Sequence, residues 1–205
     1  MAKLEDFYPH IEPYAPGLSD IQLDRALRDS IKTFCEESHA LREDSEEFTL
    51  EPGNAEVELN PSESSQVQVI GVHELWVDGW GRLQPAMPGV LSASRSRGYV
   101  GMFMRLQNNT VTLIEPPLEA RTGKALLSLC PLDDASTFSD RLLTDFRDAV
   151  VPGALGRLYR IPGTPSFSAD AAATAIAIAS GEIERARARA MLGNLRGNLR
   201  TTLVP

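Results

Sequence analysis

A cysteine and a histidine four residues apart form the first pair whose chemistry the sequence suggests. In a helix, Cys35 and His39 would share one face, because positions i and i+4 lie about one turn apart. The imidazole could then activate the thiol as a nucleophile. No glycine-rich turn that could stabilise an oxyanion lies nearby, so we interpret the pair as a buried cysteine beside a histidine at a helix end. An enzyme that uses Cys35 and His39 is a lesser alternative.

The sequence contains no recognisable motif for a metal or a cofactor. Its three histidines are scattered, and neither HxxxH nor CxxC occurs. A Walker loop is missing, as is a GxGxxG motif after a strand. Adjacent carboxylates such as Asp133 and Asp134 usually face water. We therefore expect no metal, no cofactor and no catalytic residue.

Arginines near the C-terminus are spaced for contact with a partner. Arg185, Arg189, Arg196 and Arg200 follow one another at intervals of four, seven and four residues. No lysine or aromatic residue is interleaved with them. Arginine that alternates with alanine and leucine suits planar pairing with carboxylates at a protein interface. Protein contact is the favoured interpretation, and nucleic-acid binding through this arginine stripe is an alternative.

The arginine stripe begins in a helix predicted over residues 169–192, with Ser168 as its N-cap. Apolar residues recur there at intervals of 4, 3, 4, 3 and 4, which places them on one face: Ala172, Ile176, Ala179, Ile183, Ala186 and Ala190. Because most of them are alanine, another helix can approach closely. Beyond this helix, the repeat GNLRGNLR contains two glycines and two asparagines. We predict that residues 193–205 form a flexible arm that orders on a partner.

Two further helices are predicted. The first runs from residue 20 to about residue 41 and begins with a capping box formed by Ser19 and Gln22. The second lies in residues 139–160, where Pro152 should kink or split it. Any functional site formed by residues near either end of the chain would be held in place by these helices.

Between the helices, the apolar period changes from 3.6 to 2, which is typical of strands. Phe48 and Leu50 are predicted to form a hairpin with Val57 and Leu59. Residues 66–79 should add one or two strands. A second hairpin turns at two asparagines and is expected to pair one set of apolar residues with another: Met102, Met104 and Leu106 with Val111 and Leu113 across Asn108 and Asn109.

The predicted fold class is α+β, with helices from both chain ends packed together and a small antiparallel β domain inserted between them. The expected parts are an N-terminal helical part, a β-rich insertion, a C-terminal helical part and the arm, at residues 1–45, 46–131, 132–192 and 193–205. Both helical parts would belong to one core.

Composition and charge narrow the classes of function. With 205 residues, 42% of them hydrophobic, the chain can bury a core without disulfides, and Cys35 and Cys130 are expected to be buried free thiols. Residues 1–63 carry a net charge of −11 and residues 64–205 one of +3, for a total of −8. This split suggests self-contact or two partners, and it argues against a surface that grips nucleic acid throughout. No secretion signal or transmembrane helix is expected.

Several phrases, in their order along the chain, resemble one protein family. The N-terminal part reads DFYPHIEPYAPG, then ALRDSIKTFCEES, then REDSEEFTLEPGNAEVEL. The C-terminal part reads FRDAVVPGALGRLYRIPGTPSFS and then ERARARAMLG. Together they cover roughly half of the chain, and they resemble the head-to-tail connector (adaptor) proteins of tailed bacteriophages. None of these phrases encodes a reaction.

The resemblance implies a structural virion protein that is not an enzyme. Such adaptors form a ring of about twelve subunits between portal and tail, around a channel through which DNA passes without specific binding. It implies a location in the neck of the virion, assembled in the host cytoplasm, without a membrane. The implied partners are further copies of the chain, the portal protein and a downstream neck or tail protein. Another neck or tail-completion protein, such as a tail terminator, is the alternative role.

The resemblance also assigns tasks to residues of this chain. The arm and the end of the last helix would grip the portal through Arg185, Arg189, Leu195, Arg196, Leu199, Arg200 and Leu203. The first helix is our choice for the channel wall, with the acidic residues Asp20, Asp24, Asp29, Glu36 and Glu37. An acidic wall repels the DNA backbone and lets DNA slide.

Overall fold

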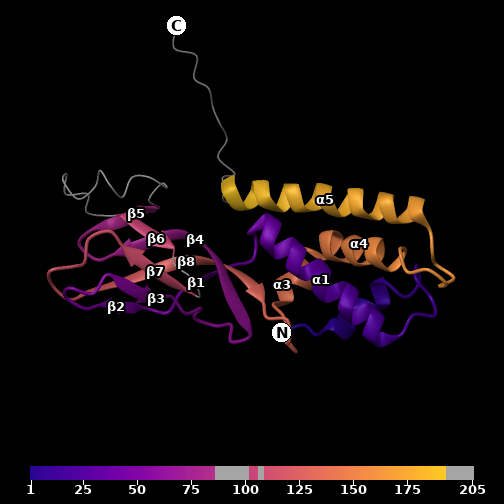
Figure 1. Ribbon diagram of the computed structural model, residues 1–205, viewed down its shortest axis with the longest axis horizontal. Coiled ribbons are helices and arrows are strands. Elements are labelled where there is room, and N and C mark those ends of the chain that lie inside the picture. Colours follow the sequence, from indigo (N-terminus) through magenta and orange to yellow (C-terminus); the bar gives the residue numbers. More distant parts are fainter. Residues whose placement is uncertain (86–101, 106–108, 193–205) are drawn as a thin grey trace, which may run out of the picture.

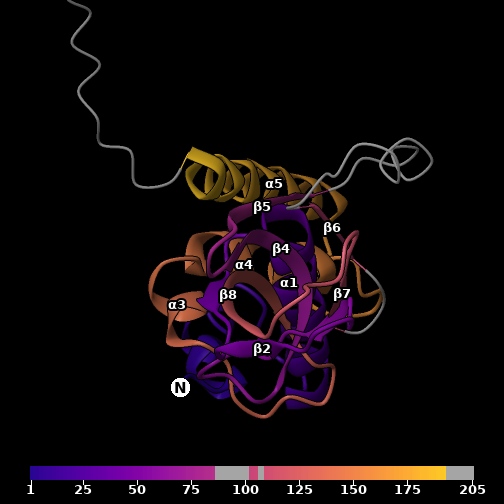
Figure 2. The same ribbon diagram turned by 90° about the vertical axis from the view of Figure 1, so that its left-hand side faces the viewer.

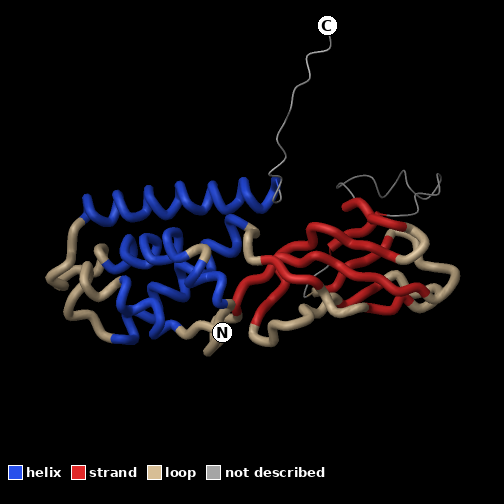
Figure 3. Tube along the Cα trace, turned by 180° about the vertical axis from the view of Figure 1, so that it is seen from behind, coloured by secondary structure: helices blue, strands red, loops and turns tan. Residues whose placement is uncertain are grey.

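The computed structural model describes residues 1–85, 102–105 and 109–192 of the chain. The molecule is elongated, with helices gathered at one end and strands at the other (Figure 1, Figure 3). It contains both helices and antiparallel strands, so the predicted α+β class is confirmed. The strands lie between the first and the later helices in sequence.

The helical end contains five described elements. They are a 3-10 helix η1 (Leu4–His10) and the helices α1 (Asp20–Ser38), α3 (Asp140–Thr144), α4 (Arg147–Leu158) and α5 (Ala169–Leu192). Helix α4 packs against both α1 and α5, so segments from the two ends of the chain meet. Arg157 of α4 donates a hydrogen bond of 2.9 Å to the Thr33 hydroxyl of α1. Figure 1 shows α5 along one side of this bundle, with its C-terminal end toward the strands.

Helix α1 begins where its capping box predicts. The Ser19 backbone N–H donates to Gln22 Oε1 over 3.0 Å, which satisfies one of the free donors of the first turn. The helix ends at Ser38, about three residues before the predicted end, because His39 adopts the left-handed conformation with φ 51°. Its backbone N–H still donates to the Cys35 carbonyl over 3.0 Å.

The second helical segment is split, but not at its proline. The break lies at Asp145 and Phe146, between α3 and α4, whereas Pro152 sits inside α4. The Phe146 ring packs with its centroid 4.7 Å from that of Phe34, so burial of this ring fixes the break. The prediction that Pro152 interrupts the helix was wrong in position. By contrast, Ser168 caps α5 as expected, since its Oγ accepts from the Ala171 N–H at 3.2 Å.

The sheet contains eight strands among the described residues. They are β1 (Arg42–Asp44), β2 (Phe48–Leu50), β3 (Glu56–Glu58), β4 (Val67–Val77), β5 (Gly81–Pro85), β6 (Met102–Arg105), β7 (Thr110–Leu113) and β8 (Arg121–Pro131). Their order is β1-β8-β4-β5-β6-β7-β3, and β2 also pairs with β8. All described pairings are antiparallel except that of β5 with β6. Seen from the strand end in Figure 2, the sheet is strongly curled.

Two predicted strand pairings were wrong in detail. Strands β2 and β3 do not pair with each other: β2 pairs with β8, and β3 pairs with β7. In the β6–β7 pair, Phe103 is opposite Leu113 and Met104 is opposite Thr112, one residue away from the predicted register. The reason is that Phe103 is the buried residue of this pair, at 4% exposed. Asn109 has φ 61°, as such a turn needs, whereas Leu106 and Asn108 lie outside the described residues.

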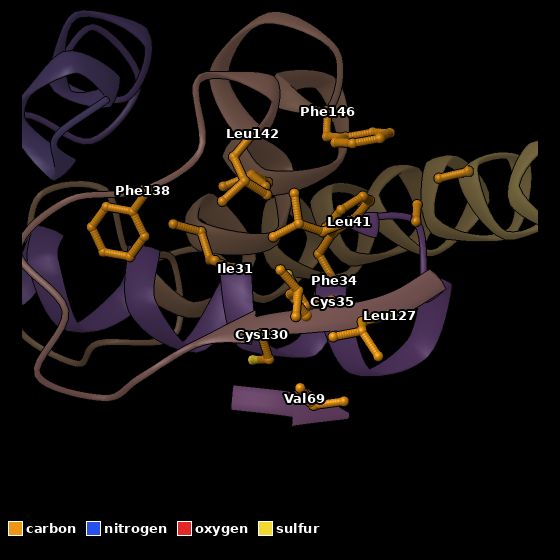
Figure 4. Packing of buried hydrophobic residues seen from close by; sticks show 14 of the residues in the cluster. Ile31, Phe34, Cys35, Leu41, Val69, Leu127, Cys130, Phe138, Leu142 and Phe146 are labelled. Carbon is orange, nitrogen blue, oxygen red and sulfur yellow. The ribbon is translucent and has the colours of Figure 1, made fainter. Parts of the chain in front are cut away.

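The helices and the sheet share one hydrophobic core. Buried residues form one continuous cluster that extends from η1 and α1 through β8 to α4 and α5. Figure 4 shows side chains of α1, β8 and the segment around α4 gathered in this core, among them Phe34, Leu127 and Phe146. Strand β8 contributes much of this core, because its last five residues, 127–131, are all buried. The orientation of the sheet is therefore tied to α1 by packing.

Candidate functional site

Helix α5 has one buried face and one exposed face, as its sequence predicted. Ala172, Ala179, Ile183 and Ala186 are buried, and Ile176 and Ala190 are partly buried: all six belong to the predicted apolar stripe. The close approach of α5 to α4 depends on a glycine. A Cβ atom added at Gly156 would lie 2.6 Å from Ile176 Cγ1, so no larger residue fits without a shift.

The described part of the arginine stripe lies on the exposed side of α5. Arg185 and Arg189 are both exposed. Arg185 forms an ion pair with Glu182, one turn earlier, and the Nε of Arg189 donates to the Arg185 carbonyl over 3.4 Å. The remaining residues that we assigned to portal docking lie outside the described part of the chain: Leu195, Arg196, Leu199, Arg200 and Leu203.

The acidic residues assigned to the channel do not share one face of α1. Successive residues of a helix turn by about 100°, so Asp20 and Asp24 lie nearly opposite Asp29 and Glu36. Asp24 is half-buried and accepts a 2.6 Å hydrogen bond from the Tyr8 hydroxyl. Burial and this bond raise the pKa of Tyr8, so the pair stays a neutral phenol bound to a carboxylate. Asp24 therefore anchors η1 to α1 in this structure.

The exposed face of α1 carries both signs of charge. Asp29 is exposed there between Arg25 and Lys32, and Glu36 is exposed one turn beyond Lys32. Glu37 lies further round the helix and borders a groove of about 290 Å³ among α1, α4 and α5. The structure thus brings together only part of the predicted acidic set. Asp20, Asp29, Glu36 and Glu37 are exposed, and of these Asp29 and Glu36 share one face of the helix.

The Cys35 thiol contacts another thiol and is fully buried. Cys35 of α1 and Cys130 of β8 are both free and both 0% exposed. Figure 4 shows the two side chains close together in the core. A hydrogen bond to Cys130 and burial raise the pKa of the Cys35 thiol. A neutral, enclosed thiol is a poor nucleophile, and this arrangement disfavours the Cys35 and His39 enzyme.

Sequence reasoning missed a serine–histidine contact where the helices meet the sheet. Ser128 Oγ donates to the His39 carbonyl at 3.3 Å and is hydrogen-bonded to His73 Nε2. The single hydroxyl proton of Ser128 points to the His39 carbonyl. We therefore assign a proton to His73 Nε2, which then donates to Ser128 Oγ. Burial, Arg42 and His39 lower the pKa of His73 to about 4. Ser128 is completely buried, so this cluster joins elements and offers no accessible nucleophile.

The cluster coincides with two irregularities in β4. Its register against β8 shifts between Val69 and Gly71 and again between Val72 and Glu74. An added Cβ at Gly71 would touch His39 Nδ1 and Ser128 Cβ, each at 3.4 Å, so this glycine lies against the cluster. Bulges re-aim side chains, and here they turn His73 toward Ser128. An isolated glycine in a strand was the only sequence signal for this feature.

The two tryptophans differ in their environment. Trp80 is partly buried beside Arg121, whose guanidinium carbon lies 5.3 Å from the ring centroid. Trp76 is 50% exposed on the outer face of the sheet. Its indole N–H donates to Glu74 Oε2 over 3.1 Å, which fixes the ring at the surface.

The comparisons with known proteins give no relative from which a role could be transferred. The sequence matches no family model, and no curated protein is significantly similar to it. Within the described residues, no three His, Cys, Asp or Glu side chains are grouped closely enough to hold a metal ion. None of the described helices combines the length and the apolar character needed to cross a bilayer. Any function must therefore be argued from the surfaces of this chain.

Proposed function

We propose that the protein is a head-to-tail adaptor of a tailed bacteriophage. In this role, copies of the chain form a ring of about twelve subunits in the neck of the virion, between portal and tail. The proposal rests on the resemblance of the sequence phrases to that family. It is supported by the exposed arginine side of α5, which leads directly into residues 193–205.

The charges on α1 and α5 suit side-by-side contact of identical subunits. Arg185 and Arg189 are exposed on α5, and Asp29 and Glu36 are exposed on α1. A ring needs a heterologous interface, in which one surface of a subunit meets a different surface of the next. Pairing the arginines of one copy with the carboxylates of the next satisfies this requirement. Arginine forms planar, bidentate pairs with carboxylates.

Docking onto the portal is assigned to the arm and the end of α5. We expect the fold to form without residues 193–205, since the described residues already form one continuous hydrophobic cluster. Deleting residues 193–205 should therefore abolish portal binding and leave the circular dichroism spectrum unchanged. The matched control is the full chain with Lys3→Glu and Arg25→Glu, two exposed charges outside α5. Normal docking by the truncated chain, with the control also normal, would refute the arm assignment.

The charge pattern of α5 argues against nucleic-acid binding through the arginine stripe. Arg185 pairs with Glu182, and Arg187 lies 3.7 Å from a Glu184 carboxylate oxygen. These carboxylates reduce the positive potential that phosphates would need. The adaptor proposal predicts weak DNA binding by the free protein, whereas a nucleic-acid-binding module would bind tightly with a steep dependence on salt.

Another neck or tail-completion protein, such as a tail terminator, remains the alternative. Both roles use rings, and the α+β fold suits either one. The long C-terminal helix followed by an arm favours the adaptor, since this end of the chain is the part expected to reach the portal. Binding to the portal in the absence of any tail protein distinguishes the two roles.

A further inference from the structure

The outer face of the sheet has a hollow beside the exposed tryptophan. It has a volume of about 410 Å³ and lies over β4, β8 and the segment that follows β1. Trp76 borders it, together with four acidic residues and one lysine: Asp44, Glu47, Glu74, Asp78 and Lys124. In the described part of the chain, no other segment covers Trp76, which is 50% exposed. Tryptophan is enriched at contact surfaces, because its ring is apolar and its N–H is polar.

The hollow keeps a negative charge after its own ion pairs are counted. Lys124 lies 3.7 Å from a Glu47 oxygen, and Arg82 lies 3.2 Å from a Glu74 oxygen. No described lysine or arginine forms an ion pair with Asp44 or Asp78. A cation placed over Trp76 would meet the negative face of the indole in a hollow whose lining includes both carboxylates. The chemistry of the hollow therefore fits an arginine-bearing peptide.

The spacing of the acidic side chains along β4 defines that peptide more closely. Every second residue at the end of β4 faces outward, and these residues are Glu74, Trp76 and Asp78. The backbone hydrogen bonds between β4 and β8 continue as far as Asp78, whose N–H donates to the Thr122 carbonyl over 2.9 Å. Four residues along a strand span about 13 Å. In the arm, Arg196 and Arg200 are also four residues apart. An extended segment would place both arginines on one side with the same separation of about 13 Å.

We propose that residues 193–205 bind in this hollow of their own chain as an extended segment. Arg196 and Arg200 pair with Glu74 and Asp78, one each, on either side of Trp76. The C-terminal end of α5, where the arm begins, points toward the strands (Figure 1). Thirteen residues reach at most about 45 Å, and tethering raises their effective concentration at the hollow.

This contact restrains the arm in the free subunit. The contact between the arm and the hollow can form without the portal. Its role in assembly rests on the proposed adaptor function, in which the portal displaces the arm from the sheet. A subunit with its arm bound to its own sheet keeps Arg196 and Arg200 occupied until the portal displaces them.

The first experiment uses a fluorescent peptide with the sequence of residues 193–205 and measures its anisotropy on full-length chains. The wild-type arm competes with the peptide, so a chain carrying Arg196→Gln and Arg200→Gln should bind the peptide about tenfold more tightly. Adding Glu74→Gln and Asp78→Asn to that chain should weaken binding about tenfold, because two ion pairs are lost. The matched control adds Glu36→Gln and Glu37→Gln instead, which removes the same charge from α1 and should change nothing.

A second measurement tests the contact within one chain. Acrylamide should quench Trp76 fluorescence more strongly in the chain with Arg196→Gln and Arg200→Gln than in the wild type, and Trp76→Phe should remove this difference. Equal quenching in both chains overturns the proposal. So does equal weakening of peptide binding by the two substitutions in the hollow (Glu74→Gln and Asp78→Asn) and the two on α1 (Glu36→Gln and Glu37→Gln). Failure of portal docking with normal peptide binding would count against the adaptor function and leave this contact standing.

Discussion

The Ser30 hydroxyl occupies the space that a side chain at Gly153 would need. Ser30 lies on α1, where it is 3% exposed, and its Oγ donates to the Val150 carbonyl of α4 over 2.7 Å. A Cβ atom added at Gly153 would overlap this oxygen. The contact between α1 and α4, which come from opposite ends of the chain, is thus specified by one small residue facing another.

Replacing Gly153 with alanine should destabilise the protein by about 1–3 kcal/mol, because the new methyl group overpacks the helix contact. Ser30→Ala alone should cost about 1 kcal/mol through the lost buried hydrogen bond. The double variant should lose less free energy of unfolding than the two single variants lose together, because the overlap disappears with the Ser30 hydroxyl. Urea unfolding of the four proteins measures this coupling.

A matched glycine provides the control for that series. Gly181 lies on α5, and an added Cβ meets nothing within 4 Å. Gly181→Ala should stabilise the protein by up to about 1 kcal/mol, because alanine favours helix. If Gly153→Ala proved as harmless as Gly181→Ala, the packing of α1 on α4 described here would be wrong.

The buried histidine predicts a loss of stability in weak acid. Burial, with Arg42 and His39, lowers the pKa of His73 from 6.5 to about 4 in the folded protein. The unfolded chain therefore takes up a proton at His73 as the pH falls through 6.5, whereas the folded chain does not until about pH 4. The stabilisation is complete above pH 6.5 and is lost between these values. Because the ring is only half-buried, we expect about 1–2 kcal/mol.

Unfolding free energies of the wild type and His73→Gln, compared across that pH window, test this prediction. The variant loses the contact with Ser128, so its free energy of unfolding is lower at neutral pH. Between pH 6.5 and 4, that free energy should fall by about 1–2 kcal/mol less than in the wild type. Identical pH dependence in the two proteins would show that His73 titrates normally in the folded state.

The two cysteines should be inert in the folded protein. Both are completely buried, and the Cys35 thiol has a raised pKa, so a maleimide should react at least about a hundredfold more slowly than with an exposed thiol. Ala173→Cys, on the exposed side of α5, supplies that reference. In denaturant, both native thiols should react at once. Rapid modification of the folded wild type would revive the Cys35 enzyme.

Local signals predicted the helices well. The capping box at Ser19 and Gln22 and the alanine stripe of α5 each depend on residues within a few turns, which the sequence displays directly. The end of α1 at His39 was harder to predict, because the left-handed residue there is a histidine and not the usual glycine. The break at Phe146 depends on Phe34, more than a hundred residues away.

Strand pairing and the candidate surfaces were less accessible from the sequence. Alternation identified Phe48 and Leu50 as facing inward, but it cannot reveal that their strand pairs with β8. The His73 and Ser128 contact required two bulges that no motif announces. Trp76 became recognisable as a surface residue only when β4, β8 and their acidic neighbours were placed together. Such sites are assembled by tertiary structure from residues that are unremarkable alone.

The central claim is that this chain is a ring-forming adaptor that docks onto a portal. Its most direct test is the native mass of the purified protein, alone and mixed with the portal protein encoded in the same genome. We expect a subunit that assembles to about twelve copies on the portal. A protein that remains monomeric with no portal complex would contradict the adaptor function.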